Sequence, residues 1–534
     1  MNKIKYVSVA EMISIEREAT TLGLSYDQMM ENAGRGLAEV VSDHYNNLKG
    51  QLIVGLVGSG NNGGDTLVAL AYLASWGWKV CAYIVRDRNP DDPLMIKMLE
   101  AGGEIIHITG DSEFHELDRL VRSAGIIMDG VLGTGIKLPL RGSVVDVLSF
   151  VKGVLASLHE PPLIVAVDCP SGIDCDTGEA APECLVADMT VTMAAYKQGL
   201  LRFPAYKFAG EIVLVGIGLS RGNKSWVSIK REVATQSQVV DLLPPRPPDA
   251  HKGTFGTALI IAGSLNYTGA VLLAGEAAYR SGAGLVTLGV STPLHSLLAG
   301  ELPEATWLLL PHEHGAIAED AADTIVSSLG RTSAILFGPG FGQAPATQRF
   351  VGRLLTEFNA IIDSRGVSDE YRLPSFTIDA DGLKLMAQFP GWADLLPAPA
   401  VLTPHPGEMA ILTGRSLLDI QSNRVEIAET YAKQWGHVVV LKGAFTVVAA
   451  PNGRTTVIPV ASAALARAGT GDVLAGLIVG LRAQGMDAYS ASIAGAWIHA
   501  QGGLRAQELL GNSACVLAGD VLHGAVKVLG QILA

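Results

Sequence analysis

The sequence predicts an α/β protein built from two tandem three-layer α/β/α domains. Strand-like apolar runs alternate with helical patterns along the chain, which is typical of parallel sheets covered on both faces. The length of 534 residues exceeds what one core usually supports. Four prolines in the five residues 244–248 break any helix or central strand, and therefore predict a stiff linker between the domains.

The first half opens with two helical patterns, at residues 8–22 and 25–45. Further helices are expected at 66–76 and 93–101. Apolar runs rich in β-branched residues predict strands at 51–57, 79–85, 125–128, 163–167, 189–193 and 212–215. This alternation predicts a first domain at residues 1–225.

The second half shows the same alternation of apolar strands and helical patterns. We assign residues 226–250, which include the proline-rich segment, to a linker region. The predicted strands of the second half lie at 258–262, 285–290, 334–337, 375–378, 400–403, 438–442 and 446–450. The second domain therefore occupies residues 251–534.

Composition restricts the classes of function. Charged residues are 17% and hydrophobic residues 49%, as in compact domains, and the net charge is −13. This charge argues against a general nucleic-acid or membrane-surface binder. The five cysteines form no metal-ligand spacing, and residues 1–5 are not followed by the apolar core of a signal peptide. We therefore expect a cytoplasmic protein without a nucleic-acid or membrane partner, and self-association through apolar surface on the N-terminal helices.

A glycine-rich turn follows the first predicted strand of the first domain. Residues 58–63 match G-x-G-x-x-G between a strand and a helix, which is the context of a Rossmann-like dinucleotide site. Asp87 ends the next strand, where a ribose-binding acid is expected. Asp65, however, would repel a pyrophosphate at the helix start. The oxygen-rich segment 61–65 also suits a hard cation, so both interpretations stay open.

Two further polar segments follow predicted strands, at 129–135 (Asp-Gly-Val-Leu-Gly-Thr-Gly) and 168–174 (Asp-Cys-Pro-Ser-Gly-Ile-Asp). Ligands of such folds collect at the carboxyl ends of strands, so we expect these segments and 61–65 to form one site. In this order, the three motifs resemble the NAD(P)H-hydrate epimerase domain.

This resemblance implies the roles of the first site. A potassium ion would be held by Asn62, Asp129 and Ser171. The hydrated nicotinamide nucleotide would contact Asp168 together with Asn61, Asn62, Gly63, Gly64, Asp65, Gly133, Thr134, Gly135, Ile136, Lys137, Leu138 and Pro139. Apart from the resemblance, Asp168 is our candidate acid/base, because epimerisation needs reversible loss and return of the hydrate's C6 oxygen, or ring opening. Lys197 could assist Asp168, although we expect it to be a surface lysine.

The most informative motif of the second domain is Gly469-Thr470-Gly471-Asp472, directly before an apolar helix. Small residues at a helix N-terminus leave backbone amides free to bind an anion, and Asp472 would stand beside that anion as a base. Such a site suits phosphoryl transfer to a hydroxyl group. His405 lies between two prolines after a strand, where a rigid loop favours substrate contact.

The segments Pro404-His405-Pro406-Gly407-Glu408 and 469–472 resemble the ADP/ATP-dependent NAD(P)H-hydrate dehydratase, a ribokinase-like fold. The resemblance implies ADP as co-substrate, with magnesium expected from phosphoryl transfer in general. It places the hydrate near Gly342, His405 and Asp472. The nucleotide would be bound by Lys442, Gly443, Ala444, Phe445, Thr446, Gly469, Thr470 and Gly471.

Together the two resemblances imply a bifunctional enzyme of nicotinamide nucleotide repair. It would interconvert the R and S epimers of NAD(P)H hydrate (NADHX and NADPHX) and dehydrate the S form, converting ADP to AMP and phosphate. Asp472 would accept the proton of the C6 hydroxyl as that oxygen attacks the terminal phosphate. Two alternatives stay open at this point: a small-molecule kinase that uses the same glycine–aspartate site, and a first domain that only binds or oligomerises.

Overall fold

A computed structural model of the chain describes residues 3–364 and 373–533. The chain divides into two compact units, a first unit of Ile4–Lys230 and a second unit that begins at Arg231. Within the described ranges, no helix has the length and apolar character needed to cross a membrane. The two units are described separately below.

The first unit contains a seven-stranded parallel sheet in the order β4-β3-β2-β5-β6-β7-β9. Its strands are β2 (Leu52–Val57), β3 (Lys79–Ile84), β4 (Glu104–His107), β5 (Ala124–Gly130), β6 (Leu163–Val167), β7 (Met189–Met193) and β9 (Glu211–Val215), and the short β1 (Ile4–Val7) and β8 (Tyr196–Lys197) pair with each other. The helices are α1 (Val9–Thr21), α2 (Tyr26–His44), α3 (Asn61–Ser75), α4 (Pro93–Glu100), α5 (His115–Ser123), α6 (Ser143–Ser157), α7 (Tyr206–Ala209) and α8 (Lys224–Ser228).

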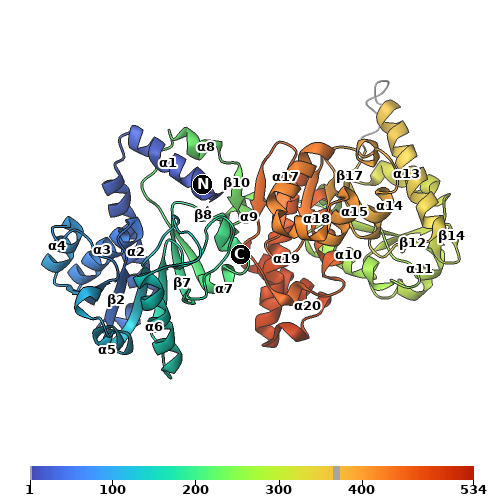
Figure 1. Cartoon of the computed structure of the whole chain (residues 1–534). Helices are drawn as coiled ribbons and strands as arrows, with labels where there is room; N and C mark the ends of the chain where they lie inside the picture. The colour runs from blue at the N-terminus through green and yellow to red at the C-terminus, as the bar shows by residue number, and fades with distance from the viewer. Residues whose placement is uncertain (1–2, 365–372, 534) are drawn as a thin grey trace. The chain divides into compact units, whose positions relative to one another are not determined.

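Two separate hydrophobic cores cover the two faces of this sheet. Along β2, Ile53 and Val57 belong to one core, which they share with α1, α2 and α3. Val54 and Leu56 belong to the other core, which they share with α5 and α6. Successive side chains of a strand point to opposite faces, so the continuous apolar run of β2 serves both layers. Figure 1 shows the helices on either side of the sheet.

The structure corrects the start of one helix in the first unit. Helix α3 begins at Asn61 rather than at residue 66, so the segment 61–65 is the first turn of a helix and not a loop. Gly60, in an extended conformation, is the N-cap. A side chain at Gly63 would lie 2.0 Å from the backbone oxygen of Gly58, so only glycine lets this turn close onto the preceding strand end.

The second unit contains a mixed sheet whose strands follow the order β13-β12-β11-β16-β17-β18-β19-β20-β21-β10. They are β10 (Arg231–Val233), β11 (Thr257–Ile261), β12 (Leu285–Ser291), β13 (Thr306–Leu310), β16 (Ala334–Phe337), β17 (Ser375–Ile378), β18 (Val401–Leu402), β19 (Val438–Leu441), β20 (Val447–Ala449) and β21 (Thr455–Val457), while β14 (His312–Glu313) and β15 (Ala316–Ile317) form a separate hairpin. The helices are α9 (Gln236–Leu242), α10 (Gly269–Arg280), α11 (Thr292–Leu298), α12 (Ala321–Ser328), α13 (Pro345–Ser364), α14 (Asp381–Met386), α15 (Pro406–Thr413), α16 (Leu417–Ser422), α17 (Arg424–Trp435), α18 (Thr470–Ala483), α19 (Ala488–Leu510) and α20 (Ala518–Ile532).

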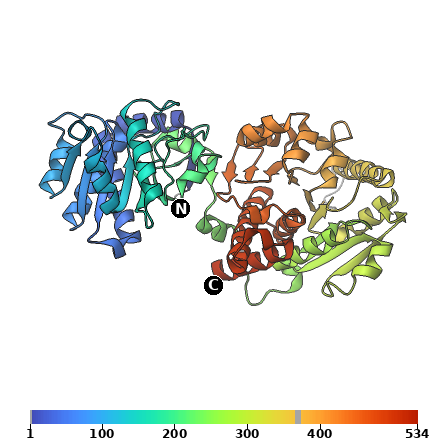
Figure 2. The same cartoon turned by 60° about the horizontal axis from the view of Figure 1, so that its bottom comes forward.

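The second sheet is also covered on both faces. Ile260 of β11 packs with α10 and α18 in one core, and α19 and α20 continue that layer. Leu259 and Ile261 pack on the opposite side with α12, α13 and α14. The C-terminal helices, drawn in red, are grouped together in Figure 2. The predicted α/β class with two sheets is therefore confirmed.

The segment 226–250, expected as a linker region, contains regular structure. β10 pairs in parallel with β21, and α9 follows it, so both belong to the second unit. The proline-rich residues 243–249 come after α9 and form neither helix nor strand. The structural division of the chain lies between Lys230 and Arg231, on the N-terminal side of the prolines.

Candidate active sites

The first unit contains a cavity of about 550 Å³ at the carboxyl ends of its strands. It is lined by the start of α3, the loop after β5, Asp168 after β6, and Glu16 of α1. The predicted residues that reach this cavity are Asn61, Asn62, Asp65, Gly133, Thr134, Gly135, Ile136 and Asp168. Gly63 and Gly64 are buried in α3 and do not line it, and Lys137, Leu138 and Pro139 line a neighbouring cavity.

Asp168 forms an ion pair with Lys197 in this cavity. Lys197 Nζ also donates to Thr192 Oγ1 at 3.1 Å and to the Met193 carbonyl at 2.8 Å. The expectation of a surface lysine is wrong, since the Lys197 side chain is only 1% exposed. A buried ammonium needs a partner, and Asp168 supplies it. Asp168 itself has a φ of +62°, a conformation that is costly for a non-glycine residue and is often found at functional sites.

Two more carboxyl groups face Asp168 across the cavity. Burial, reinforced by the charge of Asp168, raises the pKa of Asp65 well above its usual range. Burial likewise raises the pKa of Glu16. The fold therefore favours the neutral form of Asp65, which weakens the repulsion that its charge would exert on a phosphate. The sequence placed Asp168 and Asp65 at this site, and the fold adds Glu16 of α1.

The residues expected to hold potassium form a tight cluster beneath the cavity. Asp129 is fully buried, and its Oδ2 accepts a hydrogen bond from the Ser171 N–H at 2.8 Å. Its Oδ1 has no hydrogen-bond partner among the described residues. Asn62 donates to the carbonyls of Leu132 and Val167, at 2.8 and 2.5 Å. An unpaired buried carboxylate oxygen is costly, and its presence fits a bound cation.

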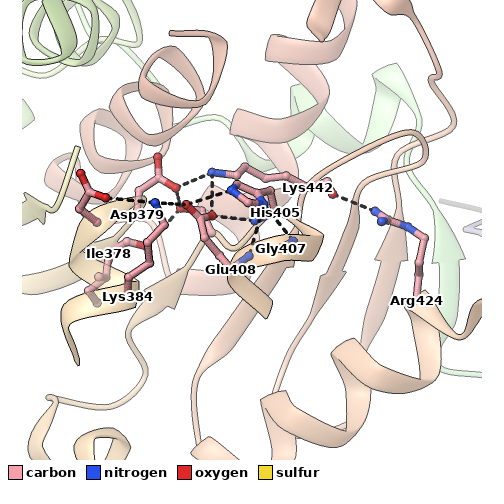
Figure 3. A network of polar contacts seen from close by, with 10 residues as sticks. Ile378, Asp379, Lys384, His405, Gly407, Glu408, Arg424 and Lys442 are labelled. Carbon is pink, nitrogen blue, oxygen red and sulfur yellow. Dashed lines mark hydrogen bonds and ion pairs between the residues drawn. The ribbon is translucent and has the colours of Figure 1, made fainter. Parts of the chain in front are cut away.

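The second unit contains a buried network of charges, shown in Figure 3. Lys442 Nζ lies 2.5 Å from Asp379 Oδ1 and 3.8 Å from Glu408 Oε2. Although burial opposes the charged form, these two carboxylates raise the pKa of Lys442. Thr403 Oγ1 also donates to Asp379 Oδ1 at 2.7 Å. The network fixes a positive charge at the carboxyl ends of β17 and β19.

Asp472 lies next to this network, in the first turn of α18. Gly469, at φ +88°, is the N-cap of α18, and a side chain at Gly471 would lie 3.4 Å from Lys442 Nζ. Burial, together with the charge of Asp379, raises the pKa of Asp472 to about 7, although Lys442 opposes the shift. Asp472 is therefore a base of moderate strength at a helix N-terminus.

His405 is placed differently from the predicted loop. It is the N-cap of α15, and its Nδ1 accepts hydrogen bonds from the N–H groups of Gly407 and Glu408 at 3.0 and 3.3 Å. Pro406 occupies the first helical position, where its missing N–H costs nothing. His405 Nε2 lies 3.3 Å from Glu408 Oε1, and burial lowers the pKa of His405. A neutral imidazole is thus held rigidly at the edge of the network.

Two cavities lie near the network. One, of about 390 Å³, is lined by Lys442, Gly443, Ala444, Thr446, Thr470, Gly471 and His405. The other, of about 440 Å³, includes Gly342, whose N–H donates to Asp381 Oδ2 at 2.9 Å. Of the predicted nucleotide-binding residues, Phe445 and Gly469 line neither cavity, since the Phe445 side chain is buried.

Two functional candidates were missed in the second unit. Asp379 and Glu408 both lie in motifs visible in the sequence, but neither was assigned a role. The sequence signal that could have identified Asp379 is an acid directly after an apolar strand, here β17, and the structure shows this acid to be buried. Its partner Lys442 is 63 residues away, and only the parallel sheet brings the two together.

A base at a helix N-terminus, beside a partly buried lysine and a nucleotide-sized cavity, defines the second unit as an enzyme of phosphoryl chemistry. Comparisons with known proteins agree. Residues 258–522 match the family described as NAD(P)H-hydrate dehydratase, and residues 26–199 match that described as YjeF-related protein N-terminus.

Relatives also match along nearly the whole chain. The bifunctional NAD(P)H-hydrate repair enzyme of Moorella thermoacetica is 34% identical over 98% of this chain and 97% of its own length. That of Salinibacter ruber is 36% identical over 88% of this chain and 86% of its own. The solved ADP/ATP-dependent NAD(P)H-hydrate dehydratase of Bacillus subtilis, co-crystallized with ATP/Mg²⁺, is 34% identical over 56% of this chain and 98% of its own, with a TM-score of 0.46.

The chain belongs to the family of bifunctional NAD(P)H-hydrate repair enzymes. The predicted pairing of an NAD(P)H-hydrate epimerase with an NAD(P)H-hydrate dehydratase is thereby confirmed. Of the alternatives left open by the sequence, the small-molecule kinase and the non-catalytic first domain are both set aside by this assignment.

Proposed function

We propose that the second unit dehydrates the S epimer of NAD(P)H hydrate by transient phosphorylation with ADP, and that the first unit interconverts the two epimers. The observation that supports the first part best is Asp472, a partly buried base with a pKa of about 7 beside Lys442 at the start of α18. Hydroxide is a poor leaving group, whereas phosphate is a good one.

In the dehydration, the hydrate's C6 oxygen attacks the terminal phosphorus of ADP while Asp472 accepts the hydroxyl proton. The bond from phosphorus to the bridging oxygen breaks, and AMP leaves. The ring nitrogen's lone pair then expels the new phosphate from C6, and loss of a C5 proton restores the double bond of NAD(P)H. The N–H groups at Gly469–Gly471 and the charge of Lys442 stabilise the negative charge that develops on the phosphoryl oxygens.

Each of the two cavities of the second unit binds one of the two substrates. The nucleotide occupies the cavity along Lys442–Thr446 and Thr470–Gly471, whose other walls include Val460, Leu465 and Ala496. These apolar side chains suit an adenine ring. The hydrate occupies the side of Gly342, with His405 between the two ligands. Within the described residues no three His, Cys, Asp or Glu side chains form a metal site, so we assign no magnesium ligand and expect the ion to arrive on the phosphates.

In the first unit, epimerisation proceeds through reversible loss of the C6 oxygen. Asp65, whose pKa is raised by burial, protonates the departing hydroxyl group, and Asp168 deprotonates the water that returns on the other face of the ring. Lys197 pairs with Asp168 and orients its carboxylate. We propose that Asp168 and the lining residues of 61–65 and 133–139 bind the hydrate. Self-association through the N-terminal helices stays a prediction.

Potassium fits the cluster of Asn62, Asp129 and Ser171, because Asp129 Oδ1 is buried without a partner. Its charge would neutralise Asp129 and hold the loops after β5 and β6 in place. We expect exchange of potassium for a large organic cation to lower the epimerisation rate and leave dehydration unchanged. Unchanged epimerisation in potassium-free buffer would contradict this assignment.

The test of the dehydratase is recovery of NAD(P)H absorbance from mixed hydrate epimers supplied with ADP, measured between pH 5 and 9. Because Asp472 must be ionised, we expect kcat/KM to fall about tenfold per pH unit below its pKa of about 7 and to level off above it. If neither ADP nor ATP supports recovery at any pH, the proposed dehydration is wrong. Recovery with ATP alone would overturn only the choice of ADP.

A further inference from the structure

A second cavity of about 480 Å³ adjoins the epimerase cavity of the first unit. The two cavities share four lining residues, Arg86, Leu132, Gly135 and Ile136, so they form one continuous depression on the two sides of the loop after β5. The Asp168 side receives the hydrated ring. A dinucleotide extends well beyond that ring, and the second cavity lies where its other end can be accommodated.

Three cationic side chains line the second cavity: Arg86, Lys137 and Arg141. No carboxylate lines it. Within the described part of the chain, none of the three makes an ion pair or a side-chain hydrogen bond. In a protein of net charge −13, three clustered cations without acidic partners are unusual.

Neighbouring arginines of the same unit behave differently. Arg88 pairs with Asp92 at 2.7 Å, and Arg122 pairs with Asp118 at 2.8 Å. The three lining cations therefore form a local positive field that is free to attract an anion.

The position of Arg86 in the fold identifies the anion. It directly follows Val85 at the carboxyl end of β3, the strand after the glycine-rich turn. In dinucleotide folds, an acid at this place binds the 2′-hydroxyl of the adenosine ribose in NAD, and an arginine nearby accommodates the 2′-phosphate of NADP. Asp87, the predicted ribose-binding acid, lines neither cavity.

We propose that Arg86, Lys137 and Arg141 bind the 2′-phosphate of NADPHX, and that the epimerase unit consequently prefers the phosphorylated hydrate over NADHX. This inference rests on the epimerase function proposed above. The phosphate is a dianion near neutral pH, and charge-assisted hydrogen bonds from a guanidinium are its strongest partners.

The test compares epimerisation of NADPHX and NADHX by the full-length protein and its variants Arg86→Ala and Arg141→Ala, which lie outside the segments 61–65 and 133–139. We expect each substitution to raise KM for NADPHX about tenfold, the loss of one charge-assisted hydrogen bond, and to change KM for NADHX less than twofold. Higher salt should weaken NADPHX binding in the wild type more than in the variants.

The matched control is Arg122→Ala, which removes the same charge from an exposed site on α5 outside both cavities. It should leave both KM values unchanged. An equal rise in KM for both hydrates, or no rise for either, would overturn the 2′-phosphate assignment.

A calorimetric titration with NADP⁺ and NAD⁺ separates this inference from the function on which it rests. If the wild type does not epimerise either hydrate, the proposed epimerase is wrong. A preference for NADP⁺ that Arg86→Ala abolishes would still support the phosphate site, whereas equal binding of both nucleotides would refute it.

Discussion

We expect Asp472→Asn to lower the rate of dehydration by about 10²- to 10⁴-fold, the usual contribution of a general base, while epimerisation continues at the wild-type rate. Asparagine keeps the size of the side chain but cannot accept the C6 hydroxyl proton. Because Asp472 and Asp168 belong to separately packed units, the loss should be confined to one activity. The measurement is NAD(P)H recovery, run alongside epimer interconversion.

The same substitution should stabilise the second unit above neutral pH. The pKa of Asp472 in the folded state, about 7, lies above its unfolded value of 3.8, so the fold disfavours the ionised form. That penalty is absent below the unfolded pKa, grows as the pH rises, and is complete above about pH 7. At pH 8 removal of the charge should therefore raise the free energy of unfolding, on the order of a few kcal/mol.

Asp320→Asn is the matched control, since this exposed residue precedes α12 without capping it through its side chain. It should change neither activity nor stability. An Asp472→Asn protein that retains dehydration would show that another group accepts the proton. One that loses both activities would show that the two sites are not independent.

The second large effect is expected from Lys197→Met in the first unit. Removal of one partner from a buried ion pair leaves the other charge uncompensated, which typically costs about 3–5 kcal/mol. Both side chains are well shielded here, at 1% and 11% exposure. Epimerisation should fail because Asp168 loses its orientation. The circular dichroism signal of folded protein should be lost at a lower urea concentration than in the wild type.

A double variant separates stability from catalysis. Asp168→Asn combined with Lys197→Met leaves no uncompensated charge, so it should recover much of the lost stability and none of the epimerisation. Lys79→Met, at an exposed position that begins β3, serves as the control and should behave like the wild type. If Lys197→Met is as stable as the wild type, the ion pair is not the buried contact described here.

Six of the seven strands of the first sheet were predicted, because each is a continuous apolar run. The edge strand β4, which has a charged residue and a histidine at its ends, was not predicted. The predicted run 163–167 matches β6, and 189–193 matches β7. The helix start at Asn61 was missed because five small and polar residues have weak helix propensity. The conformation of this segment depends on the close approach of Gly63 to Gly58. This is a tertiary contact, which helix propensity does not predict.

The second sheet was predicted less completely. β10, β13 and β21 were not predicted, although residues 307–310 of β13 form an apolar run. These short strands depend on pairing with their neighbours in the sheet, which the sequence pattern does not show. The antiparallel arrangement of β19, β20 and β21 also departs from the alternating pattern. In the sites, Asp472 and Asp168 were found through their motifs. Lys197, in contrast, was misjudged because its partner lies 29 residues away in sequence.

The division of the chain between Lys230 and Arg231 has a consequence for its synthesis. The first unit contains its whole parallel sheet and both of its cores within Ile4–Lys230, and more than half of the chain follows it. Ribosomes add about 5–20 residues per second, so this unit has on the order of tens of seconds to fold before the rest is complete. The epimerase half of the nascent chain can therefore begin to work while its dehydratase half is still being translated.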